Sequence, residues 1–462
     1  MEKENDTQKK PDNSENLFVE IPKEGVRLVE EAVEIVEEQP PIKQIRNFWH
    51  GLGPGITTGA ADDDPSGVAT YSQTGAKYGF QLLWLAGWTF PMMGAIQEMC
   101  ARIGLVTGRG LASNIKRHFP KYVLYIVAVL LLIANSFNIG ADLGALANAT
   151  QLIWPSLNYL LLVVLFTALS LVMQIFISYS QYAKYLKYLA LTLMVYVITA
   201  FVIPNFDWRE LLTHAFSPSI KFTKDQIILI CGILGTTISP YLFFWQTSQE
   251  VEEQIQEGDT TIESRRADVD KKTIRKMRID SWTGMFWSNL VMFFIIAVCA
   301  GTLFKNGTFE IGTAAQAASA LRPLAGDKAY ILFAIGIFGT GLLGIPVLAG
   351  SASYAISESL GWKEGLYRKF KQAAAFYGVI ILAMLIGMGI NFIGMDPIKA
   401  LLYSAVVNGL VAPLILVLII LISSKKAIMG QWANSKFVSI LGWIVTVFMI
   451  LVGIATIWSI FS

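Results

Sequence analysis

The feature that most constrains this chain is a series of long apolar runs that begins near residue 45. A membrane-spanning helix needs roughly 20 apolar residues, and the sequence contains eleven runs of that kind. Only 15% of its 462 residues are charged, whereas a soluble chain carries about 25%. We therefore expect an all-α polytopic membrane protein. The expected spans are 51–78, 81–106, 122–147, 157–178, 182–203, 226–247, 280–304, 328–357, 371–393, 397–423 and 436–460.

Charge divides the chain into a tail and a membrane part. Residues 1–45 are charged and polar, which predicts a flexible cytoplasmic tail, and residues 46–460 form the expected transmembrane domain. With the N-terminus in the cytoplasm, the cytoplasmic loops and span ends carry 20 Lys and Arg residues, and the opposite side carries 8. Because positive residues gather on the cytoplasmic side, we expect an N-in, C-out, multi-pass protein. The charged run 248–279 is then expected to be a solvated cytoplasmic linker.

Composition and motifs also exclude several functions. A net charge of +2 gives no basic signal for a nucleic-acid partner. The three cysteines lie in apolar runs without a Cys-x-x-Cys or Cys/His spacing, so we expect core residues rather than zinc ligands or disulfides. The sequence has no nucleophile–base constellation and no phosphate-binding loop. We therefore expect neither an enzyme nor a bound cofactor.

Two of the apolar runs are interrupted in a similar way. The first carries "GAADDDPSG" (59–67), and the sixth carries "GTTISPY" (235–241). Each has glycine upstream of a proline, which cannot donate a backbone hydrogen bond. Broken helices at matching places in two halves of a membrane protein indicate the substrate site of an inverted-repeat transporter. Two unrelated proline kinks are the alternative, because proline is common in membrane helices.

The first break holds three consecutive carboxylates, Asp62, Asp63 and Asp64. A charge at the bilayer centre costs about 2.5–3.5 kcal/mol on insertion scales and usually marks an ion path. A bound cation would offset that cost, and unwound backbone beside Pro65 would offer carbonyl oxygens as further ligands. The second break adds only oxygen ligands, and such a set suits hard ions such as Mg²⁺, Ca²⁺ or Mn²⁺. The polar side chains at the second break are Thr236, Thr237, Ser239 and Tyr241.

Other polar residues also fall inside expected spans. Asp142 and Glu98 are candidates for the ion pathway, with helix-to-helix hydrogen bonding as the alternative role for each. The full set is Glu98, Asn135, Asn138, Asp142, Asn289 and Asn408.

Across about 50–460 the chain resembles the NRAMP family of divalent-metal transporters. "GPGITTGAADDDPSG" resembles the family's first-helix motif, and "ARIGLVTGRGLA" (101–112) its segment after the second helix. "GADLGALANA" resembles its third-helix segment, and "GTTISPY" falls on the sixth-helix motif that ends Met-Pro-His in the family. The resemblance implies a LeuT-type fold of two inverted five-helix repeats plus one helix. Repeat one would span about 51–203, repeat two about 226–423, and the extra helix about 436–460.

The resemblance also implies a metal site with informative departures. Asp64 keeps the family's aspartate, with Ala61 and Thr236 supplying carbonyls, and Asp63 and Asp62 acting behind it or through water.

The family's first-helix Asn becomes Gly67, and its sixth-helix Met becomes Ser239. The His after the sixth-helix proline becomes Tyr241, and the next becomes Gln246. Asp142 is kept, but Ala145 stands where the family has an acidic partner for it. Ala405 stands where the family has a tenth-helix Gln, and Asn408 follows one turn later.

These departures have a common direction. Losing a thioether removes a preference for Mn²⁺ and Fe²⁺ over harder ions, and a roomier acidic site fits a partly hydrated Mg²⁺. Losing histidines and an acid removes proton carriers. The pattern is similar to the NRAMP-related magnesium transporters, a branch that the resemblance implies moves Mg²⁺ and Mn²⁺ without proton coupling.

We therefore expect a secondary transporter in the plasma (inner) membrane of a prokaryote, working by alternating access. Its partners would be the divalent ion and the lipid bilayer, with a monomer as the simplest assembly. The nearest alternative is a proton-coupled Mn²⁺/Fe²⁺ importer of the ordinary NRAMP type. An organic-solute symporter on the same fold is another, although three aspartates would repel a substrate carboxylate. A sensor that binds metal without moving it is the third.

Overall fold

The computed structural model describes residues 53–177 and 191–461, and every regular element within them is a helix. The expected tail 1–45 and the beginning of the expected span 182–203 lie outside these residues. The first half comprises α3 (Pro54–Asp62), α4 (Pro65–Tyr78), α5 (Trp84–Thr107), α6 (Leu111–His118), α7 (Lys121–Ile153), α8 (Tyr159–Phe176), η1 (Leu191–Met194), α10 (Val195–Val202) and α11 (Trp208–Phe216). The second half comprises α12 (Lys224–Thr237), α13 (Pro240–Glu257), α14 (Ile262–Ala267), α15 (Lys271–Cys299), η2 (Ala300–Phe304), α16 (Ala314–Ser319), α17 (Arg322–Ala325), η3 (Gly326–Lys328), α18 (Ala329–Leu360), η4 (Phe370–Gln372), α19 (Ala374–Ile390), η5 (Asn391–Ile393), α20 (Pro397–Ser424), α21 (Lys426–Met429), η6 (Gly430–Trp432) and α22 (Lys436–Phe461).

The predicted spans coincide well with the long helices. Eight helical segments in the described part of the chain are long and apolar enough to cross a membrane. They match all the expected spans except 51–78, 81–106 and 182–203. The all-α polytopic class is therefore confirmed. The count of eleven spans, their orientation and the repeat boundaries stay predictions.

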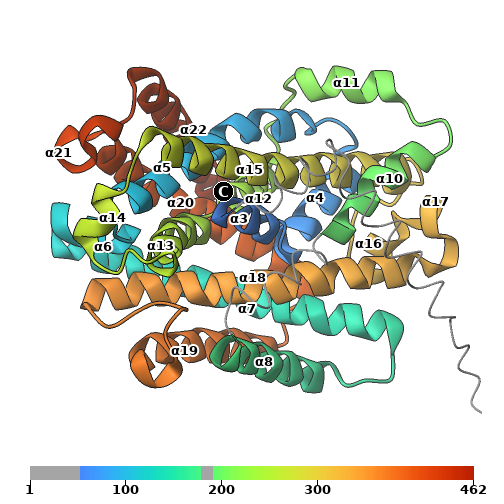
Figure 1. Ribbon diagram of the computed structural model, residues 1–462. Helices are drawn as coiled ribbons and strands as arrows, with labels where there is room; N and C mark the ends of the chain where they lie inside the picture. Colours follow the sequence, from blue (N-terminus) through green and yellow to red (C-terminus); the bar gives the residue numbers. More distant parts are fainter. Residues whose placement is uncertain (1–52, 178–190, 462) are drawn as a thin grey trace, which may run out of the picture. The chain divides into compact units, whose positions relative to one another are not determined.

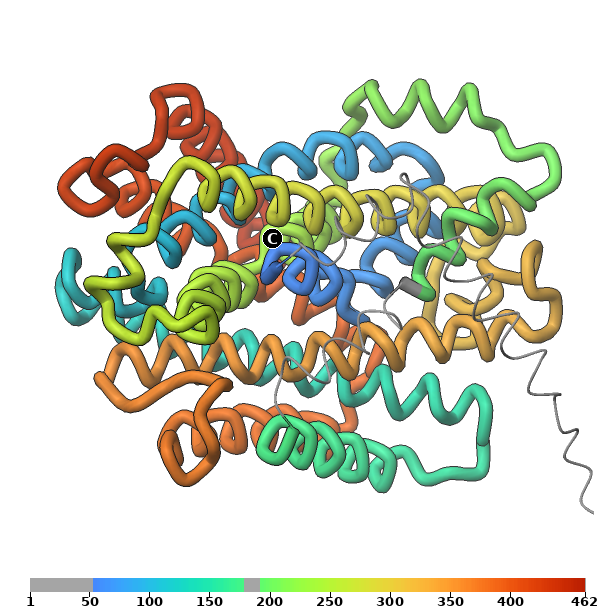
Figure 2. The backbone as a smooth tube through the Cα atoms, viewed as in Figure 1, coloured from blue at the N-terminus to red at the C-terminus, as the bar shows by residue number. Residues whose placement is uncertain are grey.

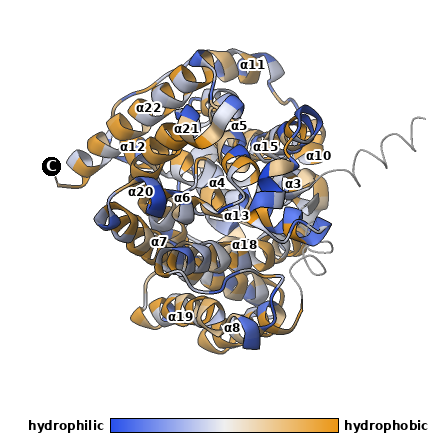
Figure 3. Cartoon of the chain, turned by 60° about the vertical axis from the view of Figure 1, so that its left-hand side comes forward, coloured by the Kyte–Doolittle hydropathy of each residue, from blue (hydrophilic) through white to orange (hydrophobic). Residues whose placement is uncertain are grey.

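The peripheral helices present apolar side chains to their surroundings. Leu161 and Phe176 on α8 are 63% and 79% exposed, and Trp458 on α22 is 75% exposed. Figure 3 shows hydrophobic colours predominating on α8, α19 and α22. Apolar exposure on this scale is unfavourable in water and is normal against lipid.

The first predicted break is a real interruption between two helices. Helix α3 ends at Asp62, and α4 begins at Pro65, whose ring is compatible with the first helical position. Between them Asp63 has φ −85° and ψ 49°, and Asp64 is extended with φ −64° and ψ 169°. Asp64 is also the N-cap of α4, because its side chain accepts a hydrogen bond from the Gly67 N–H.

The second predicted break has the same construction. Helix α12 ends at Thr237, and α13 begins at Pro240. Ile238 and Ser239 connect the two helices, and Ser239 is extended, with φ −85° and ψ 129°. Both breaks therefore place a proline at the start of the second half-helix.

The prediction that 248–279 is a solvated linker is confirmed only in part: most residues in 256–279 are exposed, but the beginning of the segment is helical and largely buried. Helix α13 continues to Glu257, and α15 already begins at Lys271. Glu250 and Glu252 are each only 4% exposed. The apolar runs end before the helices do, and these polar extensions pack against α5 and α6.

The two breaks lie among the long helices of the bundle. Helix α3 packs against α15, α13 and α18, and α4 packs against α15, α20, α12 and α7. Figure 1 shows α15 on one side of α3 and α4, with α18 and α7 on the other. The tube in Figure 2 shows α3 and α13 side by side although they are far apart in sequence.

Helix α3 is held against α15 at very short range. A Cβ added at Gly284 would lie 2.0 Å from the Gly55 carbonyl oxygen, and one added at Gly59 would lie 2.2 Å from the Gly284 carbonyl oxygen. Asp280, one turn earlier on α15, accepts hydrogen bonds from the N–H groups of Gly53 and Gly55 at 2.9 and 2.6 Å. A carboxylate at a helix N-terminus satisfies donors that have no partner within the helix.

We predict that Gly284→Ala destabilises the protein, because the added methyl group meets backbone atoms that cannot rotate away. The expected loss is about 1–3 kcal/mol, the usual cost of overpacking. The measurement is thermal unfolding in detergent. Gly378→Ala on α19 is the matched control, since no heavy atom lies within 4 Å of its added Cβ. Equal stability of the two variants would contradict the close α3–α15 contact.

Candidate metal site

Asp64 is the centre of the site and is 1% exposed. Its Oδ1 accepts hydrogen bonds from the Ser66 hydroxyl at 2.6 Å and the Gly67 N–H at 2.9 Å. Its Oδ2 accepts from the Asn138 amide at 2.8 Å and the Tyr241 hydroxyl at 3.5 Å. Three helices, α4, α7 and α13, therefore converge on one carboxylate, and each contributes a neutral donor.

Tyr241 also reaches the backbone of the first break. Its hydroxyl lies 3.2 Å from the Ala61 carbonyl oxygen, to which it donates. The predicted ligands Asp64, Ala61 and Tyr241 are thus brought together. Gly67 lies beside them, where its backbone N–H rather than a side chain faces Asp64.

Asp62 and Asp63 point toward a different helix. The Ser288 hydroxyl of α15 makes a very short hydrogen bond to Asp62 Oδ2 and lies 3.3 Å from Asp63 Oδ1. Both aspartates are buried, at 0% and 4% exposure. In the described part of the chain, no three His, Cys, Asp or Glu side chains gather as a metal-binding group. The three consecutive acids therefore divide into two groups: Asp64 contacts α7 and α13, whereas Asp62 and Asp63 contact α15.

The hydroxyls of the second break are bonded within the protein. Ser239 donates to the carbonyl oxygens of Gly235 and Thr236 at 2.8 and 2.6 Å. The Thr236 hydroxyl lies 3.0 Å from the Tyr71 hydroxyl, which also lies 3.2 Å from Thr237 Oγ1. Tyr71 on α4 thus connects the two breaks. An ion that uses Ser239 or the Thr236 carbonyl would replace their mutual hydrogen bond.

Asp142 lies next to this site on α7, one turn after Asn138. It is fully buried, and neither of its carboxylate oxygens has a hydrogen-bond partner among the described residues. A Cβ built on Gly344 of α18 would lie 3.2 Å from Asp64 Cβ and 3.9 Å from Asp142 Oδ2. Asp64 and Asp142 therefore both lie beside Gly344 of α18.

The other two pathway candidates differ in their surroundings. Asn408 on α20 is fully buried, and both polar atoms of its side chain lack a hydrogen-bond partner. Glu98 is bonded away from the breaks: its Oε1 accepts from Arg278 Nε at 2.9 Å and its Oε2 from Trp282 Nε1 at 2.9 Å. These contacts join α5 to α15, in keeping with the helix-to-helix alternative.

Four contact residues were not assigned to the site from the sequence: Ser66, Tyr71, Asn138 and Ser288. Asn138 had a usable signal, because it precedes Asp142 by four residues and so shares its helix face. Ser288 had none, since a single serine in an apolar run is compatible with any position around the helix.

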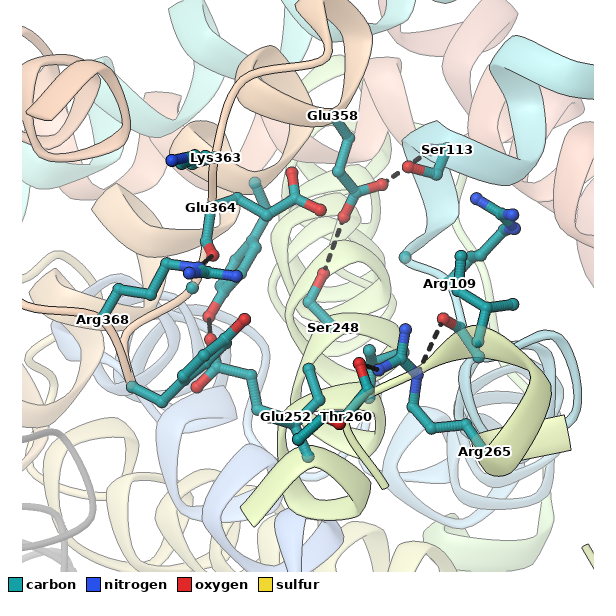
Figure 4. A pocket seen from close by; sticks show the side chains of 18 of the residues that line it. Arg109, Ser113, Ser248, Glu252, Thr260, Arg265, Glu358, Lys363, Glu364 and Arg368 are labelled. Atoms are coloured by element: carbon teal, nitrogen blue, oxygen red, sulfur yellow. Dashed lines mark hydrogen bonds between the residues drawn. The ribbon is translucent and has the colours of Figure 1, made fainter. Parts of the chain in front are cut away.

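A separate charged cavity of about 260 Å³ lies between α6, α13, α18 and the segment 361–368 (Figure 4). Glu252 accepts a hydrogen bond from the Leu366 N–H at 2.6 Å, and Glu358 accepts from the Ser113 N–H at 2.7 Å and the Ser248 hydroxyl at 3.2 Å. Burial, with the nearby charges of Glu358 and Glu252, raises the pKa of Glu364 to about 9. Figure 4 shows the three glutamates on the walls of this one cavity. No sequence pattern indicated this cavity.

The family described as Natural resistance-associated macrophage protein-like, Nramp, matches residues 55–459. The chain belongs to the Nramp family. It is 26% identical to the divalent metal cation transporter MntH of Bacillus subtilis (strain 168) over 429 residues, which cover 89% of this chain and 93% of the relative. It is 25% identical to the MntH of Deinococcus radiodurans over 424 residues, with coverage of 90% and 91%.

Comparison of this structure with solved structures finds the same fold. A crystal structure of the Eremococcus coleocola manganese transporter, in complex with an aromatic bis-isothiourea substituted compound, matches with a TM-score of 0.71 and 18% identity. The match covers 88% of this chain and 86% of that one. The relatives are membrane transporters, so the expectation that this chain is not an enzyme is confirmed. They are described as carriers of manganese or divalent metal, so a preference for Mg²⁺ remains a prediction for this Nramp chain.

We predict that Glu98→Gln lowers stability without changing ion uptake per folded molecule. Removing the charge weakens hydrogen bonds to Arg278 and Trp282, and bonds to charged groups contribute about 1.5–3 kcal/mol. Thermal unfolding and uptake into proteoliposomes are the measurements, with the exposed Glu263→Gln as control. A tenfold loss of uptake at unchanged stability would place Glu98 in the ion pathway instead.

We predict that stability falls as the pH rises through about 9, the pKa of Glu364. The folded state holds this proton more tightly than the unfolded state, whose carboxyl titrates near 4.5. The contribution is therefore fully present below pH 4.5 and is lost as Glu364 ionises. In Glu364→Gln the unfolding temperature should vary less between pH 7 and pH 10 than in the exposed control Glu257→Gln. Identical pH profiles for the two variants would contradict this assignment.

Proposed function

We propose that this divalent-metal transporter carries Mg²⁺, accepts Mn²⁺ as well, and works without proton coupling. The observation that supports the proposal most is the pairing of Asp64 with hydroxyl and amide groups. The second break faces Asp64 with the phenol of Tyr241, whose oxygen lies 3.5 Å from the carboxylate. The groups beside Asp64 that could coordinate a metal ion, the hydroxyls of Ser66 and Tyr241, are hard oxygen ligands.

The chemistry of the ion fits this donor set. Mg²⁺ gives up its water reluctantly and is commonly bound through one or two carboxylates with several waters retained. Asp64 would be the direct carboxylate ligand, and the Ala61 carbonyl an additional oxygen. Gly67 and Ser239 replace longer side chains of the family motif, so fewer side-chain ligands are available and retained water would complete the coordination.

The same contacts suggest what happens when an ion arrives. Both carboxylate oxygens of Asp64 already accept hydrogen bonds, so a cation would exchange some of those hydrogen bonds for coordination. Tyr241 would release the Ala61 carbonyl, and the Asn138 amide would keep Asp64 oriented. Both breaks lie between half-helices, which allows small changes at the site to reorient α3 and α13 during alternating access.

The absence of proton coupling is inferred from residue chemistry. Histidine is the side chain that most readily carries a proton near neutral pH. Of the chain's three histidines, His118 and His214 lie at helix ends away from the breaks, and His50 precedes the described residues. The family's motif histidine is Tyr241 here, and the acid expected three residues after Asp142 is Ala145.

The setting proposed for this activity is the plasma membrane of a prokaryote with the N-terminus in the cytoplasm. The distribution of Lys and Arg supports the orientation. The MntH relatives, which cover about the same length, come from bacteria.

A second candidate, a proton-coupled Mn²⁺ importer, is favoured by one contact. Met292 of α15 is fully buried, and its sulfur lies 3.7 Å from the Thr237 hydroxyl at the second break. A thioether close to the site favours Mn²⁺ over Mg²⁺. If Met292 takes the place of the family's sixth-helix methionine, Met292→Leu should lower Mn²⁺ uptake about tenfold and Ser239→Met should restore it.

We predict saturable Mg²⁺ uptake into proteoliposomes, with Mn²⁺ competing and with no change in internal pH. Asp64→Asn should lower Mg²⁺ uptake at least a hundredfold, because it removes the direct ligand, while the exposed Asp327→Asn should leave it unchanged. Fluorescent Mg²⁺ and pH indicators inside the vesicles give both readouts. No Mg²⁺ flux, or flux strictly coupled to protons, would overturn the proposal.

A further inference from the structure

Four carboxylates lie buried around the first break: Asp62, Asp63, Asp64 and Asp142. No ion pair links any of them to a basic side chain among the described residues. An unpaired buried charge is strongly unfavourable. One divalent ion beside Asp64 and Asp142 would balance two of the four, so the charge of Asp62 and Asp63 is left to be balanced separately.

Asp62 and Asp63 form a face of their own. A single hydroxyl, that of Ser288, lies within hydrogen-bond distance of both carboxylates. One hydroxyl has one proton, so it cannot satisfy both acids. Asp62 is 0% exposed, and within the described part of the chain its Oδ1 has no hydrogen-bond partner. An unpaired carboxylate oxygen at a site with a second carboxylate is the arrangement that a cation would complete.

This face is distinct from the one that holds Asp64. The donors to Asp64 come from α4, α7 and α13, whereas the contact to Asp62 and Asp63 comes from α15. Asp64 is the N-cap of α4, and its side chain accepts a hydrogen bond from the Gly67 N–H. Two carboxylates and a hydroxyl form a hard oxygen set with a charge of −2, which matches a divalent ion such as Mg²⁺.

We propose that Asp62, Asp63 and Ser288 bind a second divalent cation, adjacent to the ion at Asp64. This inference rests on the proposed function, because it concerns the same kind of ion in the same path. The two positions give the ion successive stopping points across the break. Neighbouring cations repel, so occupation of the second position promotes release from the first, as in multi-ion pores.

The test is the number of ions bound by the full chain in detergent. Equilibrium dialysis against Mg²⁺ or Mn²⁺, in sodium-free choline buffer, should give two ions per wild-type molecule. The double variant Asp62→Asn/Asp63→Asn should bind one, with the affinity of the remaining ion within about threefold of wild type. That retained binding also shows that the variant is folded.

Single variants separate the two positions. Ser288→Ala should weaken only the second ion, by roughly tenfold, the scale of a lost bond to a charged group. Thr283→Ala is its matched control on α15, because the Thr283 hydroxyl donates to the Ile279 carbonyl of its own helix. Asp64→Asn should remove the other ion and leave the Asp62–Asp63 ion.

The outcomes distinguish this inference from the proposed function. One ion per wild-type molecule with full Mg²⁺ uptake would overturn the second position and leave the transport proposal intact. Two ions bound without any Mg²⁺ uptake would support the second position and overturn the transport proposal. A second position that takes up ²²Na⁺ and excludes Mg²⁺ would overturn its assignment to a divalent ion.

Discussion

Buried carboxylates at the first break, which form no ion pair with a basic side chain among the described residues, dominate the energetics of this helix bundle. A regular helix through Asp62, Asp63 and Asp64 would leave these charges with few donors, because its own N–H groups are used internally. Breaking the helix at Pro65 changes that. Asp64 becomes an N-cap with two local donors, and Asn138 and Tyr241 supply more. The break and the charges therefore stabilise each other, and the remaining unpaired oxygens leave a place for cations.

Helix α15 ties this arrangement together. Asp280 caps α3, and Gly284 allows α3 to approach closely. The Ser288 hydroxyl contacts Asp62 and Asp63. Asp280, Gly284 and Ser288 are four apart and so share one face of the helix. Met292 continues the same face to the second break. A shift of α3 relative to α15 would disturb the cap, the glycine contact and the aspartate contact at once, which couples motion of the half-helix to the site.

The sequence predicted the local features well and the long-range ones poorly. Proline chemistry placed both breaks, and the apolar runs placed the long helices, because each depends on neighbouring residues. The contact of Asp62 and Asp63 with α15, away from the helices that contact Asp64, was not predicted, because it depends on which helix each side chain meets in the fold. Glu98 could not be distinguished from a pathway residue without its partners Arg278 and Trp282. The cavity of Glu252, Glu358 and Glu364 was missed because α13 extends beyond the apolar run that signals it.

The most direct test of the central claim is the position of Mn²⁺ in crystals of this protein, from anomalous scattering. Mn²⁺ is a hard divalent ion that the site should accept, and its signal locates it independently of the surrounding density. We expect a peak beside the Asp64 carboxylate, facing Tyr241, that is absent in crystals of Asp64→Asn. A peak confined to the cavity of Glu358 and Glu364, or a peak beside residue 64 that survives Asp64→Asn, would contradict it.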